Sequence, residues 1–127
     1  MDDAPQQRNG REKDIQKRAF SFACRIVNLY RFLAKQKGTG EVLARQILRS
    51  GTSIGANLEE AAAGQSRADF ISKRNIALKE ARETHYWLRL FTETKVVSPE
   101  KLNGLLNESN ELVAILTTIV KNARIPE

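Results

Sequence analysis

The chain has 127 residues, enough for one domain with a single hydrophobic core. Its composition of 41% hydrophobic and 28% charged residues is typical of a globular protein, and no stretch approaches the roughly 20 apolar residues that span a bilayer. The single cysteine, Cys24, excludes an internal disulfide, and the polar N-terminal residues lack the apolar core of a signal peptide, so we expect a cytoplasmic protein without membrane contact.

The net charge of +6 is unevenly distributed along the chain. Residues 1–50 hold 11 Lys and Arg against 5 Asp and Glu, whereas residues 51–127 hold 10 of each. A local excess of positive charge is typical of proteins that bind a polyanion, although it also occurs on surfaces that are merely solvated.

Apolar residues recur at helical spacing from residue 15 to 33 and predict a first helix that ends at Gly38 and Gly40. A second seam runs from residue 43 to 61 through Gly51 and Gly55. An interior glycine weakens a helix by up to about 1 kcal/mol, so we expect these two to allow close approach of a neighbouring helix. The seams are Ile15, Ala19, Phe22, Ile26, Leu29 and Leu33, followed by Leu43, Ile47, Gly51, Ile54, Leu58 and Ala61.

Gly64 marks the expected end of the second helix, and Ser66 followed by Asp69 predicts the start of the third. The run Ser98-Pro99-Glu100 predicts the start of the fourth, with an N-cap, a proline in the first turn and an acid beside it. Their seams are Phe70, Ala77, Ala81, Thr84, Leu88 and Phe91, then Leu102, Leu105, Leu106, Leu112, Val113, Leu116, Ile119 and Val120.

Four helices with short connections predict an all-α fold, an antiparallel up-down-up-down four-helix bundle. We expect this bundle over residues 12–123, with a flexible N-terminal tail at residues 1–11 and a C-terminal tail at residues 124–127.

The second and third predicted helices carry polar residues among small ones, and here the chain resembles the four-helix bundle proteins related to the 23S rRNA intervening-sequence protein. The resemblance is carried by Ser53, Ile54, Asn57, Leu58, Glu60 and Ala61, and by Asp69, Phe70, Ile76, Ala77, Glu80, Glu83, Tyr86, Trp87 and Leu88. It extends more loosely from about Asp14 to Val120.

This resemblance implies a small non-enzymatic bundle, sometimes encoded within insertions in the ribosomal RNA gene. Related proteins form rings of five subunits, which implies a homopentamer here. The accessory proteins of diversity-generating retroelements, which are basic pentameric bundles that bind nucleic acid and a reverse transcriptase, are distantly similar.

The first and third predicted helices are apolar on more than one side, which predicts a second packing partner for each. A cyclic homo-oligomer needs two different patches on each subunit, and these surplus surfaces supply them. The expected interface residues are Phe20, Val27, Tyr30, Ile76, Tyr86, Trp87 and Leu90.

Enzymatic chemistry finds little support in the sequence. His85 is the only histidine, and Arg82 stands where a di-iron bundle needs a glutamate. The Arg and His spacing of helical-bundle ribonucleases is absent, because Arg82 is too near His85 and Arg74 too far. No phosphate-binding glycine loop occurs. We therefore expect no catalytic residue, no metal and no cofactor.

Four polar residues on the second and third helices, Asn57, Glu60, Glu80 and Glu83, are candidates for acid–base catalysis or for a structural role. We favour the structural role, because buried polar groups need partners. Arg45 and Arg49 lie on the same side of their helix as Glu60, which suits an ion pair across a subunit boundary.

The remaining functional lead is a set of basic side chains on the first helix, its flanks and the start of the second. We expect them to contact RNA or DNA phosphates without sequence preference. They are Arg11, Lys13, Lys17, Arg18, Arg25, Arg31, Lys35, Arg45 and Arg49. The sequence thus predicts an oligomeric adaptor that binds nucleic acid weakly, and the alternative is a module that binds only another protein.

Overall fold

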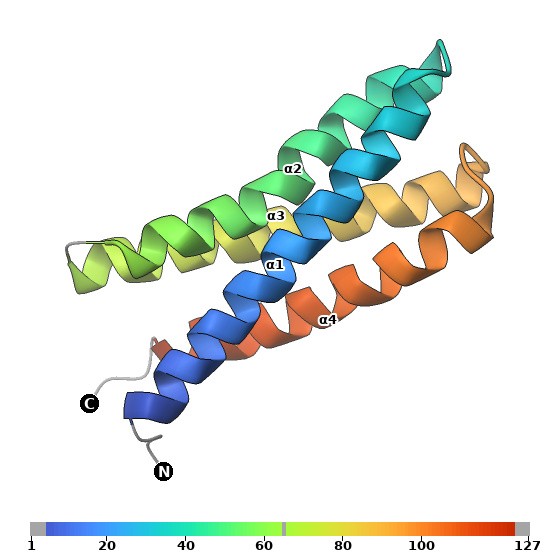
Figure 1. Cartoon of the computed structure of the whole chain (residues 1–127). Coiled ribbons are helices and arrows are strands. Elements are labelled where there is room, and N and C mark those ends of the chain that lie inside the picture. Colours follow the sequence, from blue (N-terminus) through green and yellow to red (C-terminus); the bar gives the residue numbers. More distant parts are fainter. Residues whose placement is uncertain (1–4, 65, 124–127) are drawn as a thin grey trace.

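The computed structural model describes residues 5–64 and 66–123, with side chains except at residues 5–9, 11, 12, 39 and 123. It contains helices α1 (Pro5–Ala34), α2 (Thr39–Ala62), α3 (Arg67–Thr94) and α4 (Pro99–Ala123). Each helix turns back on the one before it through a short connection (Figure 1). The prediction of an all-α four-helix bundle is confirmed.

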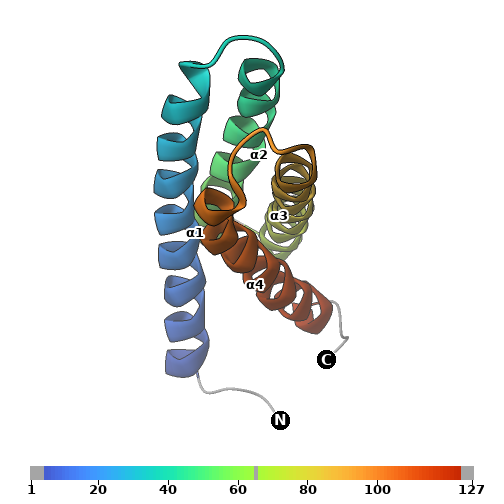
Figure 2. The same cartoon turned by 90° about the vertical axis from the view of Figure 1, so that its right-hand side faces the viewer.

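The helices pack in chain order around the bundle. Among the described residues, α1 packs on α2, α2 on α3 and α3 on α4, while α1 and α4 close the bundle along a shorter contact. The diagonal pairs, α1 with α3 and α2 with α4, do not pack on each other within the same residues. Figure 2 shows α4 diverging from α1 at a wide angle. Because α1 and α3 are a diagonal pair, their outer surfaces lie on different sides of the molecule.

The predicted seams form the core. All six seam residues of α1 are buried, from Ile15 to Leu33. Phe70 is only half-buried, because it lies in the first turn of α3 at the end of the bundle. The Arg74 guanidinium, 4.0 Å from the ring centroid, covers part of its ring. The other seam residues that remain half-buried are Leu43, Leu106, Val113 and Ile119. Helical periodicity therefore predicted the core well.

Of the two interior glycines expected to allow close packing of α1 on α2, only Gly51 is needed for it. A Cβ at Gly51 would lie 2.8 Å from Cγ1 of Ile26, which is too close for two carbon atoms. A Cβ at Gly55 would lie 3.5 Å from the Ala19 backbone, an ordinary contact distance. Gly51 is therefore the position where the absent side chain sets the distance between these helices.

The helix ends agree with the predicted signals in three of the four places. Ser66 is the N-cap of α3 and its hydroxyl accepts a hydrogen bond from the Asp69 N–H at 3.0 Å. Helix α4 begins at Pro99 as predicted, and α2 ends just before Gly64. Lys95 ends α3 in the left-handed conformation, with φ of 57°.

Two boundaries differ from the prediction. Gly40 does not end the first helix but lies in the first turn of α2, because Gly38, with φ of 101°, already makes the turn between the helices. Helix α1 begins at Pro5, so residues 5–11 of the predicted tail are helical. Proline suits a first helical turn, where its missing N–H costs no hydrogen bond. Residues 124–127 lie outside the described residues.

Candidate nucleic-acid interface

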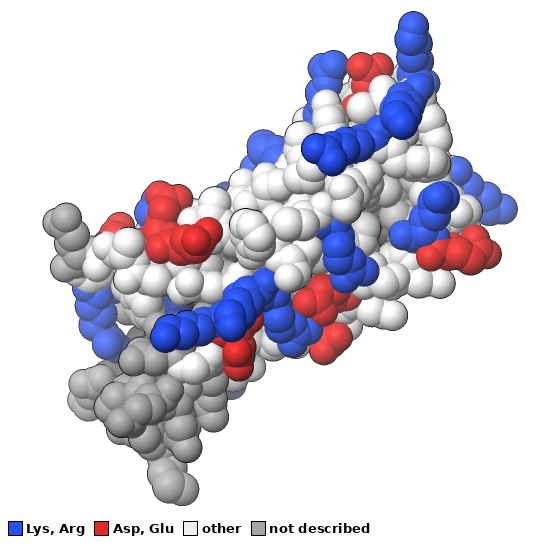
Figure 3. All heavy atoms as spheres, viewed as in Figure 1, with Lys and Arg blue, Asp and Glu red and all other residues white. Residues whose placement is uncertain are grey.

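The basic residues predicted on α1 fall into an unpaired group and a paired one. Lys13, Lys17, Arg25, Arg31 and Lys35 are exposed and form no ion pair with any described residue. The side chain of Arg11 lies outside the described part of the chain. Figure 3, which views the molecule from the side of α1, shows Lys and Arg side chains spread along this face with acidic groups between them. The face is therefore basic but discontinuous.

Arg18 belongs to the paired group, because it joins α1 to α4. Its Nε donates to Glu108 Oε2 at 3.0 Å and its Nη2 to Glu108 Oε1 at 2.7 Å, and Glu111 Oε1 lies 3.3 Å from Nη2. The hydrogen bond to Glu108 and the charges of both carboxylates raise the pKa of Arg18, and they outweigh the opposing effect of burial. Two parallel hydrogen bonds to one carboxylate hold this guanidinium in place.

Arg49 on α2 is similarly engaged. Its guanidinium forms ion pairs with Glu80, at 3.1 Å, and with Glu83, both on α3. Burial opposes the charge of Arg49, but the hydrogen bonds and charges of Glu83 and Glu80 outweigh it and raise the pKa of Arg49. The ion pair that the sequence suggested across a subunit boundary is therefore formed inside one chain, and its acidic partners are on α3.

The other predicted polar residues also have partners in the chain. Arg45 pairs with Glu41 at 3.3 Å within α2, and Lys73 pairs with Glu60 at 3.3 Å. The Asn57 side-chain amide donates to the Ser53 carbonyl oxygen at 2.8 Å. Glu83 accepts a further hydrogen bond from the Trp87 indole at 3.2 Å, so its carboxylate binds Arg49 on α2 and Trp87 on α3.

His85 lies at the contact between α3 and α4. Its Nδ1 is 3.0 Å from the Ser109 hydroxyl oxygen, and that hydroxyl donates to the Leu106 carbonyl oxygen at 2.9 Å. The Ser109 hydroxyl therefore links the His85 ring on α3 to the backbone of α4. Burial lowers the pKa of His85, and the positive charge of Arg89 lowers it further. These partners suit a structural histidine.

Of the seven residues predicted at an oligomer interface, three are exposed in the single chain: Phe20 at 63%, Tyr86 at 49% and Ile76 at 38%. Val27, Tyr30, Trp87 and Leu90 are half-buried, and Tyr30 and Trp87 pack against the core of their own subunit. Two further apolar residues, Phe32 and Val42, are exposed but were not predicted at the interface. Both fall between apolar and charged neighbours, where periodicity alone does not decide exposure.

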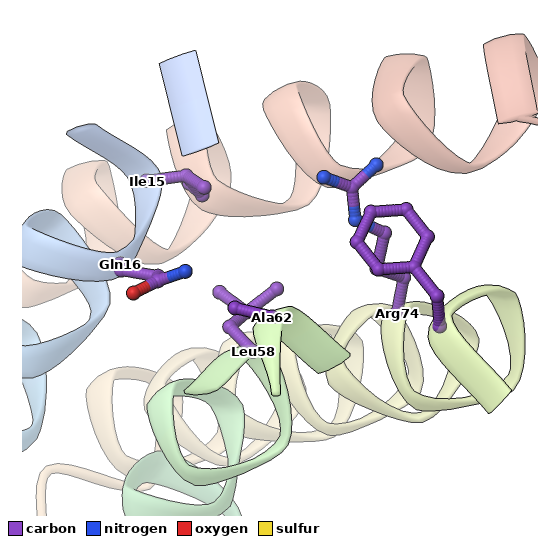
Figure 4. A pocket seen from close by; sticks show the side chains of 6 residues that line it. Ile15, Gln16, Leu58, Ala62 and Arg74 are labelled. Atoms are coloured by element: carbon purple, nitrogen blue, oxygen red, sulfur yellow. The ribbon is translucent and has the colours of Figure 1, made fainter. Parts of the chain in front are cut away.

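A small cavity lies at the end of the bundle where α1, α2 and α3 meet. Figure 4 shows Ile15 and Gln16 from α1, Leu58 and Ala62 from α2, and Arg74 from α3 around it. Its volume of about 10 Å³ holds at most one water molecule. It is too small for a substrate or a cofactor.

Within residues 5–64 and 66–123, no helix is long and apolar enough to cross a membrane. The same residues contain no group of three or more His, Cys, Asp or Glu placed to hold a metal ion. Cys24 is exposed on α1 and has no disulfide partner.

Comparison with known proteins identifies relatives over most of the chain. Residues 11–118 match the profile of the 23S rRNA-intervening sequence protein family. The chain is also similar to a crystal structure of a protein of unknown function in the S23 ribosomal protein family, from Bacteroides thetaiotaomicron. The two are 50% identical with a TM-score of 0.80, and the match covers 87% of this chain and 98% of that one. No curated protein matches the chain.

Proposed function

The chain belongs to the 23S rRNA-intervening sequence protein family, and from this membership and the surface of α1 we propose that it is a non-enzymatic adaptor that binds RNA or DNA weakly. The contact is made to phosphates and carries no sequence preference. A cytoplasmic location fits this proposal, since nucleic acid is present there and a lone thiol such as Cys24 stays reduced.

One observation carries the nucleic-acid part of the proposal. The exposed cations Lys13, Lys17, Arg25, Arg31 and Lys35 on α1 have no carboxylate partner among the described residues, whereas Arg18, Arg45 and Arg49 do. Five unpaired cations that neutralise phosphates release the counterions condensed on a polyanion, which favours association, and the affinity then falls as salt is added.

A filter-binding titration against salt tests this part. We expect binding of a generic single-stranded RNA near 50 mM salt that weakens steeply by 200 mM. The double variant Lys17→Glu/Arg31→Glu should bind more weakly. Lys95→Asn is a suitable control, because Lys95 is exposed, lies off α1 and occupies a left-handed position that asparagine tolerates. Absence of binding at 50 mM salt contradicts the proposal.

We further propose that the adaptor is a homo-oligomer and, following the resemblance, a pentamer. The exposed Phe20 on α1 and Ile76 on α3, two helices that do not pack on each other, support two distinct contact surfaces on each subunit. Light scattering at several concentrations measures the mass directly. A chain that stays monomeric at high concentration contradicts the oligomer.

The discontinuous charge of the α1 face and its exposed apolar residues also favour a second candidate, a module that binds only another protein. Nuclease treatment during affinity purification separates the two functions. A partner bridged by RNA is lost after treatment, whereas a directly bound protein is retained.

A further inference from the structure

An open groove of about 400 Å³ lies between α3 and α4, and it carries basic residues outside the set predicted to contact nucleic acid. Its lining residues are Asn75, Leu78, Lys79, Arg82, Thr117, Val120 and Lys121. The buried side chains of Leu78 and Val120 form an apolar floor, and three of the seven lining residues are cationic. A ligand for this groove therefore combines negative charge with an apolar surface.

The three cations have no neutralising partner among the described residues. Lys79, Arg82 and Lys121 are exposed, form no ion pair there, and none of the described residues that line the groove is Asp or Glu. Lys79 and Arg82 are three residues apart on one helix face, where like charges destabilise each other. On the neighbouring face of α3, by contrast, Glu80 and Glu83 are bound to Arg49. An anion in the groove would relieve the repulsion.

The basic surface continues along α3 past an exposed aromatic ring. Tyr86 lies one turn beyond Arg82, and the Arg89 guanidinium lies 5.9 Å from the centroid of its ring. Trp87 contacts the same ring edge-on, with centroids 5.2 Å apart, which restrains it. Tyr86 itself remains 49% exposed. Cations that alternate with an exposed aromatic ring are the combination with which proteins bind single-stranded nucleic acid.

We propose that this groove binds the phosphates of a single-stranded RNA or DNA, and that an unpaired base stacks on Tyr86. The site is separate from the cations of α1, because α1 and α3 are diagonal helices. It rests on the proposed nucleic-acid function but assigns the contact to a different face. A duplex, whose bases are stacked on each other, gains the phosphate contacts only.

Two triple variants with equal loss of charge test the assignment in the full chain. The groove variant is Lys79→Gln/Arg82→Gln/Lys121→Gln, and the α1 variant is Lys17→Gln/Arg31→Gln/Lys35→Gln. All six side chains are exposed, and circular dichroism verifies that each variant is folded. The probe is a fluorescein-labelled 12-nucleotide uridine strand, measured by anisotropy from 50 to 300 mM salt, with a 12-base-pair duplex beside it.

The logarithm of the association constant K falls linearly with the logarithm of the salt concentration. Removing three phosphate contacts from a single strand makes this slope less steep by about 2, which corresponds to roughly hundredfold weaker binding at 0.1 M salt. We expect this loss in the groove variant. Tyr86→Leu should weaken binding of the strand about tenfold without changing the salt slope, since it removes stacking and no charge. The duplex should be insensitive to Tyr86→Leu.

The outcomes separate the two proposals. If only the groove variant loses affinity, the groove assignment stands and the assignment to α1 fails. If only the α1 variant loses affinity, the groove assignment is overturned while the proposed function stands. If the strand does not bind the unaltered protein at 50 mM salt, both are overturned.

Discussion

The hydroxyl oxygens of Ser50 on α2 and Thr84 on α3 lie 2.9 Å apart, and both residues are fully buried. The Thr84 hydroxyl is the donor, and it also lies 2.8 Å from the Glu80 carbonyl oxygen, so both acceptors are within its reach. Their sequence neighbours Arg49 and Glu83 pair at the surface. One polar contact inside the bundle and one outside thus set the register of α2 on α3.

We predict that Thr84→Val destabilises the protein by about 1–2 kcal/mol, although valine has nearly the same shape. The substitution leaves the Ser50 hydroxyl with only a long contact of 3.5 Å to the Ile47 carbonyl oxygen. Urea unfolding followed by circular dichroism measures the loss. In the double variant Ser50→Ala/Thr84→Val the combined cost should be smaller than the sum of the single costs, because no unsatisfied hydroxyl remains. Strict additivity would contradict the contact.

Gly51→Ala should destabilise the protein even though alanine favours a helix. The new methyl would overlap Cγ1 and Cγ2 of Ile26, at 2.8 and 2.9 Å, and such overpacking costs about 1–3 kcal/mol. Gly10→Ala is the matched control, because Gly10 is also helical and a Cβ there meets nothing within 4 Å. That variant should gain up to about 1 kcal/mol. Thermal unfolding of both variants must give shifts of opposite sign.

Protonation of His85 should weaken the fold in mild acid. The pKa of His85 is lowered in the folded chain, so between that value and the ordinary 6.5 the unfolded chain binds more protons. Its contribution to stability is therefore complete above about pH 6.5 and is lost as the pH falls toward the lowered pKa. Unfolding midpoints at pH 7.5 and 5.5 measure this loss.

His85→Gln is the control for the pH effect, because glutamine can still donate to Ser109 but does not titrate. The variant should lose less stability between the two pH values than the unaltered protein does. Equal losses in both would show that other groups cause the acid sensitivity.

Glu108→Gln should weaken the contact between α1 and α4, which is the least extensive of the four helix–helix contacts between the described residues. It reduces the paired hydrogen bonds to Arg18, and we expect a loss of about 0.5–1 kcal/mol, as for well-formed surface ion pairs. The loss should diminish in 1 M salt, where charges are screened. Glu111→Gln is the matched control, since Glu111 is 62% exposed and makes one contact at 3.3 Å, and it should be nearly neutral.

Much of the architecture could be predicted from the sequence. The seams from Ile15 to Leu33 and from Leu102 to Val120 placed the core, and the cap at Ser66 and the proline at Pro99 placed two helix starts. These features are local, because they depend on residues within one or two helical turns. The start of α1 at Pro5 was missed, since the first residues of this helix carry no apolar seam.

The candidate site could be predicted only in part. Lys17 and Arg18 are neighbours in the sequence, and both were selected for their charge. Only the fold decides that Arg18 meets Glu108, 90 residues away, while Lys17 has no ion-pair partner among the described residues.

The sequence by itself determined the helices, their buried sides and the positive charge of the first 50 residues, because spacing along a helix and composition are properties of the chain alone. The tertiary structure decided which cations are free for a ligand. It placed Arg49 against Glu80 and Glu83, and it brought Lys79 and Arg82 beside Lys121 around a groove whose described lining residues include no carboxylate. An ion pair between helices depends on their register, and periodicity carries no information about register.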